Sequence, residues 1–296
     1  MKKSKLEKGG IYSGFSVHSV KELPEYDSLC VRLFHQGTGC EVFHLYNDDR
    51  ENLFSYIFRT PCRDDTGVTH ILEHSVLCGS RRFPLKDPFV LLLKGSMRTF
   101  LNAFTAPDCT MYVASSTVEQ DFFNLMLVYG DAVFSPLLKE EIFMQEAHHP
   151  AFMDKTDPSR GVEIVGVVYN EMKGNYSEPE NVVYDWAYRG LFPDTQYRHE
   201  SGGDPDAIPD LTWEMLKKYY RTYYHPSNCR IFLYGNIPTE ASLSYIEENF
   251  LSGKEKKEID SRISIQTRWS QPRLITKTYP VTVSDITRAR EETKGR

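Results

Sequence analysis

Three strand-like runs precede the first helical pattern of this chain, and only short turns separate them. The runs cover residues 28–35, 40–45 and 53–59, and the turns between them cover 36–39 and 47–50. These turns contain glycine, asparagine and aspartate, which suit tight hairpins. A parallel pairing would need a crossover of about a dozen residues or more, so the runs are predicted to pair as antiparallel strands.

The rest of the chain mixes helical and strand-like patterns without the alternation of a βαβ fold. Apolar residues at helical spacing predict a first helix over 66–77, with Thr66 as its cap. Residues 162–175 are apolar early and polar late. Further helices are predicted over 89–94, 119–134, 211–223 and 239–251, and further strands over 101–106, 111–115 and 230–235. This order favours an α+β fold, an antiparallel sheet with packed helices, over a doubly wound parallel sheet.

Changes in composition along the chain indicate three segments. Residues 1–25 are polar, with Pro24 near their end, and are expected to form an amino-terminal arm. Residues 26–262 carry the patterned elements and are expected to form one domain. Residues 263–296 lose this patterning and end in an almost wholly polar stretch. They are expected to be a linker or the start of a further domain.

Composition limits the classes of protein to which the chain can belong. It has 296 residues, of which 40% are hydrophobic, enough for one large core or two modest ones. A net charge of −6 argues against a nucleic-acid partner. No run reaches the roughly 20 apolar residues of a membrane span, and no apolar stretch follows the basic start, so we expect no membrane and no targeting segment. The six cysteines are scattered, which favours reduced thiols in a cytoplasmic protein.

The segment His70-Ile71-Leu72-Glu73-His74 carries the most specific chemical signal. Residues four apart lie on one face of a helix, so His70 and His74 can face one cation. Two imidazoles suit Zn²⁺, and Glu73 lies beside them, placed to act on a metal-activated water rather than to bind the metal. The order H-x-x-E-H inverts the commoner zinc-peptidase motif. A catalytic zinc needs a third protein ligand; the candidates are Glu171, Glu163, His148, His149 and Glu146.

The segment 69–80, THILEHSVLCGS, closely resembles the start of the active site of presequence proteases, within the pitrilysin/insulinase superfamily. Further segments resemble that family in the same order along residues ~25–280. They are KGS at 94–96, LNAFT at 101–105, NEMKG at 170–174, SGGDP at 201–205 and YYHPSN at 223–228. The resemblance implies a zinc peptidase of the inverted-motif type.

The resemblance also implies roles for particular residues. It makes Glu171, 97 residues after His74, the third zinc ligand, in a segment that the family makes helical. His148 and His149 fall where the family has a strand, whose adjacent side chains face opposite ways, so they are assigned to structure or surface. Residues 101–105 would be an edge strand beside the zinc. The backbone of Asn102 and Ala103 would bind an extended peptide there.

Two interpretations of the neighbouring side chains remain open. We expect Leu101 and Phe104 to pack in the core. Alternatively, Phe100 and Phe104 line a pocket for a substrate side chain.

The loop 201–204 is not expected to bind phosphate, because it lacks the following Lys-Ser or Lys-Thr pair of a P-loop. Tyr223, Tyr224 and His225 are expected to end a helix and pack.

The resemblance covers only the first of four related domains. In the family, a carboxy-terminal half closes a chamber and contributes an arginine and a tyrosine. The sequence therefore predicts a zinc endopeptidase for short unfolded peptides, with a carboxy-terminal half or partner chain that completes the chamber. The alternative is an inert zinc- or peptide-binding fragment, or one subunit of a split protease. Zinc binding is better supported than turnover in isolation.

Overall fold

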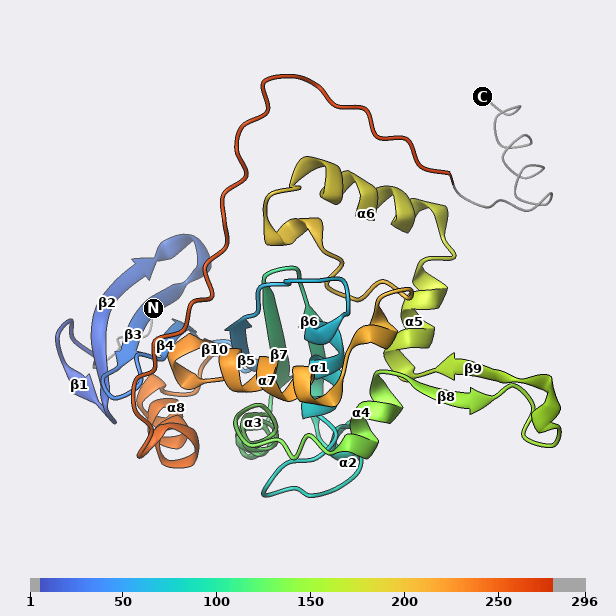
Figure 1. Ribbon diagram of the computed structural model, residues 1–296. Helices are drawn as coiled ribbons and strands as arrows, with labels where there is room; N and C mark the ends of the chain where they lie inside the picture. Colours follow the sequence, from blue (N-terminus) through green and yellow to red (C-terminus); the bar gives the residue numbers. More distant parts are fainter. Residues whose placement is uncertain (1–5, 279–296) are drawn as a thin grey trace, which may run out of the picture.

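A computed structural model describes residues 6–278, and its centre is a sheet of eight strands. The strands lie in the order β1-β2-β3-β4-β10-β5-β7-β6 (Figure 1). Every neighbouring pair is antiparallel except β4 and β10. The strands are β1 (Ile11–Tyr12), β2 (Phe15–Leu23), β3 (Ser28–His35), β4 (Glu41–Tyr46), β5 (Asn52–Arg59), β6 (Arg98–Thr105), β7 (Cys109–Ser116) and β10 (Cys229–Gly235). The predicted α+β class, with a sheet and packed helices, is confirmed.

The predicted strands are all present, but one predicted hairpin is wrong. Strands β3 and β4 pair directly across the turn at 36–39. Strands β4 and β5 do not, because β10 lies between them and pairs with both. A strand that arrives more than 170 residues later along the chain thus splits the expected hairpin. No local pattern reports an insertion of this kind.

The expectation of an arm over 1–25 is wrong from residue 11 onward, because strands β1 and β2 of the sheet lie there. Strand β2 pairs with β3 over eight register positions, and Phe15 and Val17 are buried in the core. A register shift between Val17 and Ser19 interrupts the regular alternation of the strand. That irregularity hides the period of two by which strands are recognised. The boundary at 262 stays a prediction.

Helices pack on the sheet through aromatic side chains. Helix α3 (Glu119–Phe134) contacts β5 and β7, and α1 (Val68–Val76) contacts β6. Phe54 of β5 meets Phe122 of α3 with ring centroids 5.6 Å apart. Aromatic pairs in such edge-to-face contact stabilise a core beyond the area that they bury.

Most predicted helices are confirmed with small changes of boundary. They are α1, α2 (Pro88–Gly95), α3, α7 (Trp213–Tyr223) and α8 (Thr239–Ile246), which continues as a π-helical turn over Glu247–Leu251. The stretch 162–175 divides into β9 (Val162–Val165) and α5 (Val167–Asn175). Strand β9 pairs with β8 (His149–Phe152) as a ribbon that projects from the body (Figure 1). Tyr223 and Tyr224 are buried at the end of α7, as expected.

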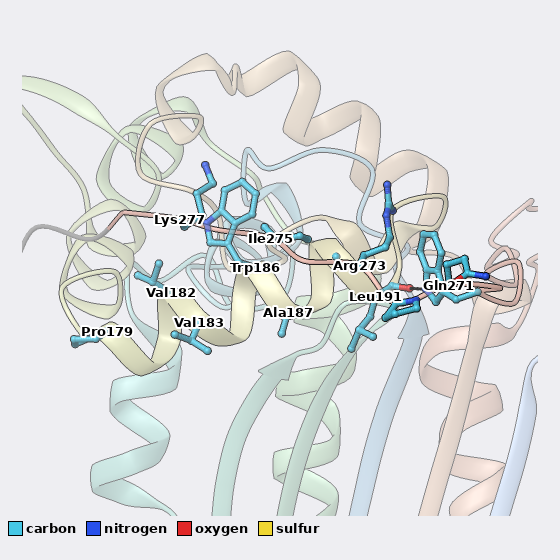
Figure 2. A pocket seen from close by; sticks show the side chains of 13 residues that line it. Pro179, Val182, Val183, Trp186, Ala187, Leu191, Gln271, Arg273, Ile275 and Lys277 are labelled. Atoms are coloured by element: carbon cyan, nitrogen blue, oxygen red, sulfur yellow. Dashed lines mark hydrogen bonds between the residues drawn. The ribbon is translucent and has the colours of Figure 1, made fainter. Parts of the chain in front are cut away.

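Two helices were not predicted, α4 (Glu140–Glu146) and α6 (Pro179–Leu191). Helix α6 buries only Asp185, while several of its apolar side chains line a groove whose other wall is the extended segment 269–277. Figure 2 shows Trp186 of α6 beside Ile275 and Lys277 of that segment. Together they enclose a groove of about 700 Å³. No helix among residues 6–278 is both long enough and apolar enough to cross a bilayer.

Candidate metal centre

Helix α1 presents the two histidines of the HxxEH motif from a rigid base. Every residue of the helix is buried except His70 and His74. The predicted cap, Thr66, is wrong, because its hydroxyl donates to Asp64 Oδ1 at 2.6 Å and Gly67 occupies the cap position. Gly67 has a φ of 68°, and a Cβ there would lie 2.7 Å from the carbonyl oxygen of Gly202. Only glycine fits both the left-handed backbone and this close approach.

His70, His74 and Glu171 converge on one point. Their ligating atoms all lie within 4.8 Å of one another. The Oε2 of Glu171 lies 3.8 Å from His70 Nε2 and 4.0 Å from His74 Nε2. Ligands at about 2.0–2.1 Å from a tetrahedral zinc are roughly 3.3 Å apart. The three donor atoms are therefore close to the separation that zinc requires, and two imidazoles with one carboxylate are a donor set that it favours.

The second ring nitrogen of each histidine faces a hydrogen-bond acceptor. His70 Nδ1 lies 3.2 Å from the carbonyl oxygen of Gly202, and His74 Nδ1 lies 3.1 Å from Glu146 Oε2. Each Nδ1 can only donate to such an oxygen, so each Nε2 is left free to bind a cation. The loop 201–204 thus contacts one of the two histidines directly.

Glu146, one of the candidate third ligands, contacts the Nδ1 atom of His74 instead, where its carboxylate orients the imidazole ring. Burial lowers the pKa of His74, but the hydrogen bond to Glu146 and the nearby carboxylates outweigh burial and raise it. Burial raises the pKa of Glu146, and its hydrogen bonds with His74 and Gln145 lower it overall. The two groups stabilise each other as an ion pair whenever His74 is protonated.

Glu73 lies beside the cluster and outside the set of converging donors. Its side chain is 8% exposed, and the hydroxyl of Thr105 donates to its Oε2 at 2.6 Å. Thr105 is the last residue of β6, so the edge strand holds the carboxylate in place. Local sequence patterns do not predict this contact, because 32 residues separate Thr105 from Glu73.

Strand β6 is the edge of the sheet, as predicted, and it borders the converging side chains of His70, His74 and Glu171. Residues 102–105, the three converging side chains and residues 200–202 line one cavity of about 420 Å³. The amide of Ala103 donates to the side-chain oxygen of Asn102 at 2.9 Å. The Asn102 side chain thus satisfies a main-chain donor at the edge of the sheet.

The expectation that Phe104 packs in the core is wrong. Its side chain is 42% exposed, lines the cavity, and stacks on Phe100 with centroids 6.3 Å apart. Leu101, on the other face of the strand, packs against the core as expected. Alternation along β6 explains both outcomes, since the strand has one covered face and one open face.

The other candidate ligands lie apart from the cluster. His148 Nε2 lies 2.9 Å from the carbonyl oxygen of Leu211, and His149 Nδ1 lies 2.8 Å from that of Met144. Glu163 is an exposed residue of the β8–β9 ribbon. Within residues 6–278, His70, His74 and Glu171 are the one set of three or more potential ligands that converges.

Two solved structures share this fold. The crystal structure of pitrilysin aligns with a TM-score of 0.62 at 17% identity, covering 83% of this chain and 26% of that one. A protease from Helicobacter pylori aligns with a TM-score of 0.60 at 18% identity, covering 78% of this chain and 51% of that one. The fold is that of the pitrilysin-type peptidases.

Sequence comparison identifies the family. The mitochondrial presequence protease of Danio rerio is 48% identical over 260 residues, 88% of this chain and 25% of that protein. Protein HypA of Clostridium perfringens is 46% identical over 282 residues, 95% of this chain and 29% of that protein. A family model described as the peptidase M16 inactive domain matches residues 210–294, which follow all three candidate ligands in the chain. The chain belongs to the M16 peptidase family and spans between a quarter and a third of the length of these relatives.

Proposed function

We propose that this chain is the metal-binding part of a zinc endopeptidase that hydrolyses short, unfolded peptides. The observation that carries the proposal is the convergence of His70, His74 and Glu171 within 4.8 Å, with Glu73 beside them. The three converging side chains would hold one Zn²⁺ through two Nε2 atoms and one carboxylate oxygen. When bound, the ion polarises a peptide carbonyl and lowers the pKa of water.

Glu73 is the group that moves protons in this proposal. Its carboxylate takes a proton from the attacking water and delivers it to the leaving amine as the C–N bond breaks. Thr105 fixes one carboxylate oxygen by its 2.6 Å hydrogen bond and leaves the other oxygen available. The buried position of Glu73 on α1 keeps it beside the histidines without adding a ligand.

The edge strand β6 is the proposed binding site for the peptide backbone. An extended peptide can pair with the edge near Asn102 and Ala103 through main-chain hydrogen bonds, which require no particular sequence. The Asn102 side chain then releases the Ala103 amide to the peptide. Phe104 and Phe100 offer an exposed aromatic surface for one substrate side chain.

A second candidate function is peptide binding without turnover. Among the described residues that line the cavity there is no lysine, arginine or tyrosine. The described part of the chain thus gives the cavity no cationic or phenolic donor that would stabilise an oxyanion, and a donor of this kind is often worth about 10²–10³ in rate. A carboxy-terminal half or a partner chain is proposed to supply it.

Peptide cleavage by the purified chain tests the proposal. Two samples contain the chain, zinc and a mixture of unstructured peptides. The second sample also contains a polypeptide that corresponds to the part of a relative beyond the region matched by this chain. We expect chelator-sensitive cleavage in the combined sample and little in the chain alone. Zinc binding without cleavage in either sample would favour the second candidate.

Glu73→Gln separates the proposed chemistry from metal binding. The variant should retain zinc and lose hydrolysis by roughly 10²–10⁴, the range of general acid–base catalysis. Glu163→Gln, on the exposed ribbon, is the matched control and should cleave normally. Normal cleavage by Glu73→Gln would contradict the mechanism.

A further inference from the structure

A single guanidinium lies between α6 and the loops that border the metal centre. Arg189 Nε lies 2.9 Å from Asp185 Oδ1, one turn earlier in α6. Its Nη2 lies 3.0 Å from Asp65 Oδ1 and 3.7 Å from Asp204 Oδ2. Three carboxylates from three segments therefore meet one arginine whose side chain is 20% exposed. A partly buried ion group of this kind fixes geometry, because removing one member leaves the others uncompensated.

Asp65 carries this anchoring into the loop 199–204. Its Oδ1 accepts the backbone amide of Glu200 at 2.9 Å, and its Oδ2 lies 3.2 Å from His199 Nδ1. Its own carbonyl oxygen accepts the amide of Asp204 at 2.8 Å. Both ends of the loop are thus fastened to Asp65, which Arg189 in turn holds against α6.

The middle of the same loop contacts the metal-binding helix. The Ser201 carbonyl accepts the hydroxyl of Thr69 at 2.8 Å, and the Gly202 carbonyl faces His70 Nδ1 at 3.2 Å. The backbone of Gly67, at the start of α1, lies close to this loop, since a Cβ at Gly67 would be 2.7 Å from the Gly202 carbonyl oxygen. His74 is held separately, by Glu146 of α4. A shift of the loop therefore acts on His70 and spares His74.

We propose that Arg189 is a positioning residue for His70, acting through Asp65 and the carbonyl of Gly202. The inference rests on the proposed metal site, since it assigns Arg189 a role in ordering one ligand. On one side, apolar residues of α6 line a groove together with the segment 269–277 (Figure 2). On another side, Arg189 of α6 pairs with Asp65. Helix α6 thus holds the loop 199–204 in place through the contact between Arg189 and Asp65.

Zinc affinity of the full 296-residue chain tests the proposal first. Affinity is measured by competition with a chromophoric chelator for the wild type, Arg189→Met and Arg189→Lys. Loss of an outer hydrogen-bonding partner typically weakens metal binding by 10–100-fold, and a partner one step further out should cost about 3–10-fold. Arg189→Lys should lose less affinity than Arg189→Met, because lysine keeps the positive charge. It should still bind zinc more weakly than the wild type, because lysine lacks the planar guanidinium that contacts several carboxylates at once.

Arg160→Met is the matched control. Arg160 pairs with Asp154 at 3.1 Å in the connection of the β8–β9 ribbon, far along the chain from the loop. It should bind zinc as the wild type does. Equal affinity of wild type and Arg189→Met would overturn the proposal, and so would an equal loss in the Arg160→Met control.

The metal-free chain provides a test that does not depend on zinc. With ¹⁵N-labelled histidine, the ring nitrogens of His70 and His74 are observed separately in wild type and Arg189→Met. We expect the His70 Nδ1 resonance to shift or broaden and that of His74 to stay unchanged. Equal changes at both rings would mean general loosening and would overturn the proposal. Failure of wild-type zinc binding would refute the proposed function and leave this ring measurement decisive for Arg189.

Discussion

The two helices that carry the proposed metal ligands differ sharply in how the rest of the protein contacts them. Helix α1 is buried at every residue except its two histidines, and each imidazole is fixed through its second nitrogen. Helix α5 buries only Val168 and Met172, and the side chain of its proposed ligand Glu171 is 54% exposed. The two histidines are therefore held in position by the core before metal binds, whereas Glu171 is exposed to solvent.

This difference in burial predicts that the ligands of α1 and α5 contribute unequally to the affinity for zinc. A preorganised ligand binds without further loss of side-chain entropy, while an exposed carboxylate must be ordered when the metal arrives. The histidines of α1 should therefore contribute most of the affinity. Glu171 should complete the site at a smaller gain. Variants of each ligand, and amide exchange in each helix, test this difference.

Replacing His74 with alanine should nearly abolish tight zinc binding. Structural zinc sites bind with roughly 10–16 kcal/mol, so loss of one well-oriented ligand should cost about 4 kcal/mol, or about 10³-fold in affinity. Chelator competition measures the change. His18→Ala, at an exposed position of β2, should leave the affinity unaltered. A loss below tenfold for His74→Ala would place the ion elsewhere.

Glu171→Gln should weaken zinc binding by about 10²-fold, less than the histidine change, because the exposed carboxylate must be ordered and a neutral amide remains in its place. Metal analysis after dialysis against a weak chelator should show lowered occupancy. Full occupancy in this variant would remove Glu171 from the site. A loss equal to that of His74→Ala would contradict the unequal division between α1 and α5.

Hydrogen exchange compares the two helices directly in the metal-free chain. The amides of α1 should exchange about thirtyfold more slowly than those of α5, a difference of about 2 kcal/mol in opening free energy. The cause is the buried surface of α1 and the exposed surface of α5. Mass spectrometry of peptides covering 68–76 and 167–175 measures the ratio. Equal protection would show that burial does not distinguish the two ligand helices.

Glu146→Gln should weaken zinc binding by about tenfold, because the amide oxygen can still accept from His74 but the charge is lost. Glu163→Gln, once a candidate ligand and exposed on β9, is the control and should have no effect. An unchanged affinity for Glu146→Gln would show that α1 alone orients His74.

The part of the site that lies on one helix was predictable from sequence alone. Spacing of four residues places His70 and His74 on one face, and no tertiary information is needed. Glu171 follows by 97 residues, so only resemblance to a family joined it to them. Glu146, Thr105 and Gly202 were not foreseen as supporting groups. Their contacts with α1 depend on how distant segments meet, and that information is absent from any local pattern.

The fold shows the same limit. Hairpin-like runs and amphipathic periods predicted β3, β5, α3 and α7 closely. Strand β2 was missed because a register shift breaks its alternation, and α6 was missed because its charged face, with Arg189 and Asp185, points inward. The placement of β10 between β4 and β5 required knowledge of pairing across more than 170 residues.

X-ray absorption at the zinc edge of the purified chain observes the proposed ligands themselves. We expect one zinc per chain, bound by two imidazole nitrogens and a carboxylate oxygen at about 2.0–2.2 Å. The Glu73→Gln variant should give the same spectrum, and His74→Ala and Glu171→Gln should each lose one ligand of the expected kind. A wild-type spectrum without two imidazoles, or one that changes in Glu73→Gln, would contradict the assignment of His70, His74 and Glu171 as the metal ligands.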